Sequence, residues 1–122
     1  AQYADLSNVF GSPATVRHKA AVLREHCAQV GRDPSEVQLT QLSTALVGTD
    51  DAHVRELVDR LRPRRQDPAG YAAAVNAGTV ADHIGRFREL ADAGASEVMV
   101  RLPDLTDAEP VERMGKVIAT FR

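Results

Sequence analysis

The apolar positions along the chain follow two periods, one typical of strands and one typical of helices. Residues 6–10 and 97–102 are short apolar-leaning runs, and residues 36–47 are rich in β-branched side chains. Apolar and polar residues alternate over 37–42, which favours a strand. The intervening segments carry apolar residues at spacings of three and four, which indicates amphipathic helices. The pattern therefore predicts strands at 6–10, 36–47 and 97–102, with helices between them.

The first helix is predicted most sharply. Ser12 is a good N-cap, Pro13 suits the first helical position, and Gly31 supplies a left-handed residue at the end. Further helices are predicted from Asp50-Asp51 to Pro63, over 71–75, from a Thr79 cap to Gly94, and from about Glu109 onward. The apolar faces expected to be buried are Val16, Ala20, Leu23, Cys27 and Val30; Val54, Leu57, Val58 and Leu61; Ile84, Phe87, Leu90 and Ala91; and Val111, Met114, Val117, Ile118 and Phe121.

The resulting order is strand, helix, strand, helical insertion, helix, strand, helix. Such alternation predicts an α/β fold built from right-handed βαβ units, with helices packed on a parallel sheet. Three strands are few for such a sheet, because a parallel sheet needs both faces covered and its edges paired. The chain is therefore compatible with the last three βα units of a larger barrel, and less so with a self-sufficient fold.

Composition and charge narrow the class of protein. Apolar residues make up 43% of the chain and charged residues 26%, which is the balance of a globular domain. The formal net charge is -2 with both signs mixed, so nucleic acid is not an expected partner. No apolar run approaches the roughly 18 residues of a membrane span, and no leader is evident, which makes a cytoplasmic setting the default expectation. The start without Met hints at a fragment.

Four segments resemble the luciferase-like flavin- and deazaflavin-dependent oxidoreductases. Residues 3–8 match the pattern Y-A-D-x-x-N, and residues 23–34 are similar to a helix end that reads L-x-x-x-C-x-x-x-G-R-D-P. Residues 78–84 resemble the helix start G-T-P-E-E-V, with Val80 in place of the usual proline. Residues 91–100 resemble the run into the last strand of these enzymes. The four segments occur in the family's order and cover nearly the whole chain.

This resemblance implies a partial (β/α)8 TIM barrel, with residues 1–122 as a single C-terminal fragment of it, since the complete fold has about 250 residues. The three strands would be the sixth, seventh and eighth, and the cofactor would be FMN or the deazaflavin coenzyme F420, acting on a small organic substrate. Much of the cofactor grip in the family comes from earlier strands, so the chain alone is expected to be catalytically incomplete. It would then be a homo-oligomer, with Leu39, Leu42, Val98 and Val100 as exposed apolar surface, or would need the N-terminal half of the barrel. The alternative is a non-catalytic α/β module that binds a ligand or self-assembles.

Candidate site residues follow from the rule that barrel enzymes place their sites at the carboxyl ends of the strands. This rule selects Asn8, the pair Gly78-Thr79, and Arg101 as cofactor-binding residues. Each has a structural alternative: Asn8 as a turn residue, Gly78-Thr79 as an ordinary helix cap, and Arg101 as the ion-pair partner of Asp104 or Glu97. The same rule also selects residues 10–12, the insertion 48–78 and Asp104.

No catalytic constellation is visible in the sequence. The four histidines fall in predicted helices without metal-ligand spacing, and His18 and His26 lie off the apolar stripe of their helix. Cys27 lies on that stripe, where a small apolar filler is expected and a nucleophile is not. The catalytic residues therefore stay unknown, and no metal site is predicted.

Overall fold

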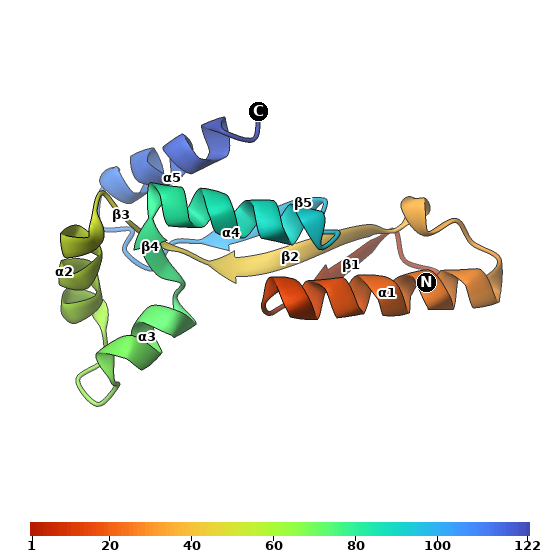
Figure 1. Cartoon of the computed structure of the whole chain (residues 1–122), viewed down its shortest axis with the longest axis horizontal. Helices are drawn as coiled ribbons and strands as arrows, with labels where there is room; N and C mark the ends of the chain where they lie inside the picture. The colour runs from red at the N-terminus through yellow and green to blue at the C-terminus, as the bar shows by residue number, and fades with distance from the viewer. The chain divides into compact units, whose positions relative to one another are not determined.

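The computed structural model describes residues 1–122 and has the predicted alternation of strands and helices (Figure 1). In chain order the elements are β1 (Leu6–Val9), α1 (Pro13–Val30), a short 3-10 helix η1 (Pro34–Glu36), β2 (Gln38–Thr44), β3 (Leu46–Gly48), α2 (Asp51–Leu61), α3 (Pro68–Ala74), β4 (Ala77–Thr79), α4 (Val80–Asp92), β5 (Glu97–Arg101) and α5 (Glu109–Ala119). The chain divides into two compact units. The first unit comprises residues 1–43 and 86–99, and the second comprises residues 44–85 and 100–122. No helix is long and apolar enough to cross a membrane.

The larger sheet has the strand order β1-β2-β5. β1 and β2 are parallel, with Leu6 opposite Gln38 and Val9 opposite Gln41. The Ser96 N–H donates to the Leu39 carbonyl (2.8 Å) near the start of β5, and the Ala45 N–H donates to the Arg101 carbonyl (3.0 Å) near its end. β5 therefore runs in the same direction as β2. Three adjacent parallel strands with two open edges confirm the predicted partial barrel, and the sheet does not close.

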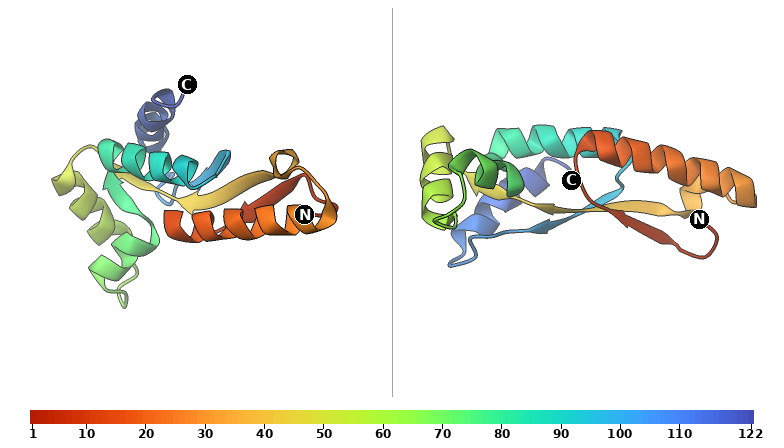
Figure 2. Two further views of the ribbon diagram at one scale, coloured as in Figure 1. Left: turned by 45° about the vertical axis from the view of Figure 1, so that its right-hand side comes forward. Right: turned by 90° about the horizontal axis from the view of Figure 1, so that it is seen from below.

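Helix α1 begins and ends where its capping residues predict. The Ser12 hydroxyl accepts from the Thr15 N–H, and Gly31 adopts the left-handed conformation (φ 69°) after the last turn. The helix runs along the sheet (Figure 2) and buries Val16 and Cys27 completely. Leu23 is only half-buried, and Val30 is exposed, which corrects the predicted stripe. Eighteen helical residues span about 27 Å, more than a short strand covers, so the last turn extends past the sheet.

Strand β2 keeps one alternation of faces along its whole length, although its sequence changes phase at Gln41 and Leu42. A Cβ added to Gly94 would contact both Ala20 of α1 and Leu39 of β2. Leu39 therefore lies on the face of the sheet that α1 covers, here called the helix-covered face. Strict alternation then turns Gln41 inward, where it is 2% exposed, and Leu42 outward, where it is 41% exposed. The prediction of exposed apolar surface is therefore confirmed for Leu42 and wrong for Leu39, because the two residues lie on opposite faces.

The opposite face of this sheet, here called the uncovered face, carries Asn8 and Thr40, which hydrogen-bond to each other across the β1–β2 pair. Alternation adds Leu6 and Leu42 to it, with exposed fractions of 58% and 41%, and Met99 of β5 is also 41% exposed. The predicted apolar surface was partly wrong. Leu39 is buried under the helices, and Val98 and Val100 are half-buried on β5, while the flanking residues of that strand are exposed. β5 is consequently not the fully buried strand that its sequence predicts.

The second unit contains a small parallel sheet that the sequence did not reveal. β3 pairs with β4, with Leu46 opposite Ala77 and Gly48 opposite Thr79. The predicted strand 36–47 is therefore two strands, separated at Ala45. β4 is a three-residue Ala-Gly-Thr strand whose extended conformation depends on its pairing with β3, so its local sequence gives no strand signal. The core of this unit consists of Leu46, Leu57, Val58 and Val75.

The remaining helices differ from prediction in where they begin or in which residues they bury. α3 begins at Pro68, three residues earlier than expected, because the Asp67 carboxylate caps it. α4 buries Phe87 and Leu90 as predicted, but it buries His83 and exposes Ala91. α5 buries Met114 and Val117 as predicted. The other three residues that were predicted to be buried are about half exposed: Val111, Ile118 and Phe121. Arg113 is buried instead.

Candidate functional site

Asn8, the predicted site residue of the first unit, lies near the carboxyl end of β1 on the uncovered face. Its side-chain oxygen accepts a hydrogen bond from the Thr40 hydroxyl (3.0 Å). The orientation of the Asn8 side chain is therefore set by Thr40 on the neighbouring strand. It is not set by a hydrogen bond within a turn, which was the structural alternative for this residue. The amide group remains exposed, so it can still donate to a ligand.

Gly78 and Thr79 form the end of β4 and lead directly into α4. The Thr79 N–H donates to Asp82 Oδ2 (2.9 Å), and the Asp82 N–H donates to Thr79 Oγ1 (3.2 Å). This reciprocal arrangement is a capping box. The hydrogen bonds from Thr79 lower the pKa of the Asp82 carboxyl below its ordinary value. A carboxylate already satisfies this helix start, so a bound anion here would meet a negative charge, whereas a neutral acceptor would not.

Arg101 ends β5, and its side chain is exposed. The ion pair with Asp104 that the sequence allowed does not form, because Asp104 pairs with Arg113 instead. No ion pair engages the Arg101 guanidinium, so it remains available to an external anion. Residues 10–12, also selected by the carboxyl-end rule, form the turn into α1, where Phe10 is exposed.

Three polar side chains lie on the helix-covered face of β2 or against it, and sequence reasoning had missed them. Gln41 Nε2 donates to the Gly11 carbonyl (3.1 Å), while the buried Gln41 Oε1 has no partner. Arg86 of α4 donates to the Ser43 hydroxyl (2.6 Å), and burial lowers the pKa of this arginine. The available signal was the position of Gln41 and Ser43, which alternate in phase with the buried Leu39.

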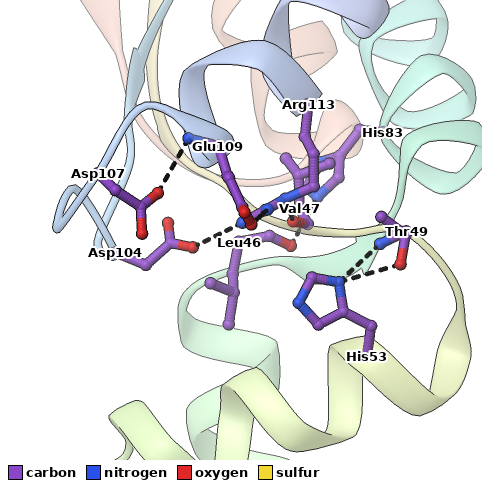
Figure 3. A network of polar contacts seen from close by, with 9 residues as sticks. All are labelled: Leu46, Val47, Thr49, His53, His83, Asp104, Asp107, Glu109 and Arg113. Atoms are coloured by element: carbon purple, nitrogen blue, oxygen red, sulfur yellow. Dashed lines mark hydrogen bonds and ion pairs between the residues drawn. The ribbon is translucent and has the colours of Figure 1, made fainter.

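Arg113 is the centre of a buried polar network in the second unit (Figure 3). Its side chain is 8% exposed and donates from Nε to the Val47 carbonyl (2.6 Å) and from Nη2 to Asp104 Oδ2 (3.1 Å). A weaker contact joins Nη1 to Glu109 Oε2 (3.4 Å). Arg113 thus ties β3, the loop after β5 and the first turn of α5 together. The Glu109–Arg113 spacing of four residues was the only sequence signal for this network.

Two histidines of the second unit have fixed ring orientations. The Thr49 N–H donates to His53 Nδ1 (3.1 Å), so Nδ1 is unprotonated and Nε2 carries the hydrogen (Figure 3). His83 is buried and places Nε2 3.1 Å from the Leu46 carbonyl, which can only accept. His18 and His26 are exposed, as expected for residues off the apolar stripe of their helix. Cys27 is completely buried, as expected for an apolar filler.

No group of three or more histidine, cysteine, aspartate or glutamate side chains is placed to hold a metal ion. A groove of about 360 Å³ in the first unit lies at the amino end of β2 between α1 and Ser96, away from the predicted residues. Of the predicted site residues, Gly78, Thr79 and Arg101 belong to the second unit, and Asn8 belongs to the first.

Comparison with known proteins identifies the fold. No protein-family model and no curated protein matches the sequence. An F420-dependent secondary alcohol dehydrogenase, solved in complex with an F420-acetone adduct, is similar in structure with a TM-score of 0.70 and 17% identity, over 98% of this chain and 44% of that chain. A coenzyme F420-dependent tetrahydromethanopterin reductase from Methanopyrus kandleri has a TM-score of 0.69 and 15% identity, over 99% of this chain and 46% of that chain. The chain thus has the fold of a part of these enzymes and spans less than half of their length.

Proposed function

We propose that this chain is the C-terminal part of a luciferase-like oxidoreductase that uses the deazaflavin coenzyme F420, and that it is not catalytically complete alone. The observation that carries the proposal is the similarity of nearly the whole chain to less than half of two F420-dependent enzymes. The parallel strand order β1-β2-β5 supports it, because it is the order expected of three consecutive barrel strands. The cofactor would supply the redox chemistry, and the chain would help to position it.

The residues at the strand ends differ in how well they suit such a cofactor. Arg101 suits a phosphate group, because its guanidinium is exposed and not engaged in an ion pair. Asn8 suits a neutral polar edge, since its exposed amide can donate. Gly78 and Thr79 suit a neutral acceptor better than a phosphate, because Asp82 already caps the start of α4. FMN carries a phosphate as well, so it remains the competing cofactor.

Weak, localised binding of F420 to the purified chain is the test. With most of the cofactor contacts assigned to absent strands, we expect dissociation constants weaker than about 1 μM, a limit that corresponds to about 8 kcal/mol. Amide NMR signals at millimolar F420 should shift at residues 8–11, 78–79 and 101–104. Signals of Val37 and Ser96, at the amino ends of the strands, should not shift. FMN titrated in parallel measures the preference between the two cofactors.

Arg101→Gln is the informative variant, with Arg24→Gln as a matched exposed control on α1. We expect R101Q to remove the shifts at residues 101–104 and R24Q to leave them unchanged. Absence of any shift at millimolar F420, or shifts confined to the amino ends of the strands, would contradict the proposed cofactor site. Micromolar or tighter binding would show that the chain is a working minimal domain and would contradict its incompleteness.

A further inference from the structure

The groove of the first unit has all of its walls within that unit. Its lining comes from α1, from η1 and the first residues of β2, and from Gly94 and Ser96 in the turn before β5. Ala20 and Leu39 place it on the helix-covered face of the sheet, over the central strand β2. Asn8 is on the other face, so the groove is separate from the cofactor residue proposed in this unit. The groove therefore forms without any strand beyond the three described.

Leu23 shows that the interior of the groove is apolar and incompletely packed. It lies on the same stripe of α1 as Ala20 and Cys27, which are 6% and 0% exposed, yet Leu23 is only half-buried. A leucine on the sheet-facing side of a helix is left half-buried where it lacks a neighbour. Val37 and Leu39 of β2 line the groove opposite the helix. An apolar group placed there would restore the contacts that a void forfeits, so the interior suits a hydrocarbon chain.

Arg24 is the only charged residue of the lining. Its side chain is exposed and takes part in no ion pair. Two carboxylates border η1, and both are engaged elsewhere. Asp33 accepts from the N–H at the start of η1, and Glu36 pairs with Arg32. The groove thus combines an apolar interior with one positive charge and has no negative charge in its lining.

We propose that this groove binds a small amphiphilic carboxylate, with the carboxylate at Arg24 and the hydrocarbon chain between Leu23 and β2. Arginine suits this head group because its planar guanidinium can donate two parallel hydrogen bonds to a carboxylate. Ser35 and Gln38 are exposed in the lining and can donate further hydrogen bonds. The volume of about 360 Å³ is in the usual range of ligand sites, which are mostly apolar with a few polar groups that fix orientation. This inference does not rest on the proposed function.

Octanoate, titrated into the purified chain and followed by amide NMR, tests the proposal. We expect a dissociation constant of about 0.1–1 mM, because a ligand of this size makes few contacts. The amide signals of Leu23, Arg24 and Ser96 should shift, while those of Gly78 and Arg101 in the second unit should not. No shift up to about 10 mM octanoate, or shifts spread evenly over both units, would overturn the proposal.

Matched ligands separate the apolar part of the site from the charged part. Hexanoate should bind more weakly than octanoate, by up to about fourfold for each CH2 group removed. Octan-1-ol has the same chain without the charge, and it should bind at least about fivefold more weakly than octanoate. Equal affinities of octanoate and octan-1-ol, or of octanoate and acetate, would contradict a site that uses both parts.

Substitution of Arg24 tests the position of the carboxylate. Arg24→Gln should lower the affinity for octanoate at least about fivefold and leave the affinity for octan-1-ol unchanged, whereas Arg24→Lys should retain most of it because the charge remains. Arg17→Gln is the matched control, since Arg17 is exposed on the same helix and does not line the groove. A loss with R17Q as large as with R24Q would show attraction to a charged surface in general and would exclude this site.

Discussion

Gly94 shows at the scale of one residue how the backbone limits the sequence. It follows α4 with φ +116°, a conformation that residues with a Cβ rarely adopt, and a Cβ there would lie 3.3 Å from Ala20 Cβ. We expect Gly94→Ala to lower the free energy of unfolding by about 1–3 kcal/mol. Urea midpoints measure the change.

Gly85→Ala is the matched control, because Gly85 is exposed within α4 and no heavy atom lies within 4 Å of a Cβ there. Removing a helical glycine should raise the unfolding free energy by up to about 1 kcal/mol. Equal effects of the two substitutions would show that the turn at Gly94 does not need a glycine.

The buried charge of Arg113 leads to a second prediction, which concerns the free energy of unfolding. Arg113→Met leaves the Asp104 carboxylate buried without its partner, and breaking a buried pair from one side costs about 3–5 kcal/mol. Arg101→Met, at an exposed arginine without an ion pair, should change the unfolding free energy by less than about 0.5 kcal/mol. Thermal or urea unfolding compares them. A small effect of R113M would mean that Asp104 finds water or another partner.

Several of these residue environments could not be predicted because they depend on contacts remote in the sequence. Gln41 is buried since the strand keeps its alternation after the sequence has changed phase, and its amide reaches Gly11, thirty positions earlier. His83 and Arg113 are buried because the carbonyl groups of β3 accept from them. Cys27, by contrast, was predictable from helical spacing alone. Whether Asn8, Gly78, Thr79 and Arg101 contact a cofactor stays a prediction.

At the scale of elements, the start of α4 makes stability depend on pH. The pKa of Asp82 is lowered in the folded state by hydrogen bonds from Thr79, and its ordinary value is 3.8. Its stabilising effect is therefore fully present above that ordinary value and is lost as the pH falls through the lower, folded-state pKa. We expect Asp82→Ala to cost about 0.5–2 kcal/mol near pH 7, as loss of a cap does.

The difference in unfolding free energy between wild type and D82A should shrink as the pH falls below 3.8. Asp82→Asn is the control, since its side-chain oxygen still accepts from the Thr79 N–H without a titrating charge. Its deficit should be smaller than that of D82A near pH 7. A D82A deficit that stays constant from pH 7 to pH 3 would show that the carboxylate charge does not stabilise the helix.

The helices were predictable as elements because their signals are local. Ser12, Pro13 and Gly31 define α1 within its own sequence, and Asp50 does so for the start of α2. β4 and the break at Ala45 were not predictable, because a three-residue strand is stabilised only by its partner β3. Each long helix buries part of its predicted face, but Val30 of α1 and Ala91 of α4 are exposed. On α5 the buried Arg113 takes a place where apolar packing was predicted.

For the whole molecule, the order of strands and helices was sufficient to predict a parallel sheet of βαβ units, because such units allow few topologies. The family resemblance implied the partial barrel. The similarity to less than half of two longer enzymes agrees with that prediction. The division into two compact units was not predictable, since it depends on which segments pack together.

The self-association expected from the sequence has a consequence for stability that involves the whole molecule. If only the folded chain pairs, then raising the protein concentration stabilises the folded state by mass action. Once the concentration exceeds the dissociation constant, each tenfold increase adds at most about 1.4 kcal/mol per dimer, so the urea midpoint should rise between about 1 and 200 μM protein. Leu42→Asp should make the midpoint independent of concentration, while Val30→Asp, at a similarly exposed residue of α1, should retain the dependence. A wild-type midpoint that does not change with concentration, with unfolding reversible throughout, would mean that the folded chain is stable with Leu42 exposed to water.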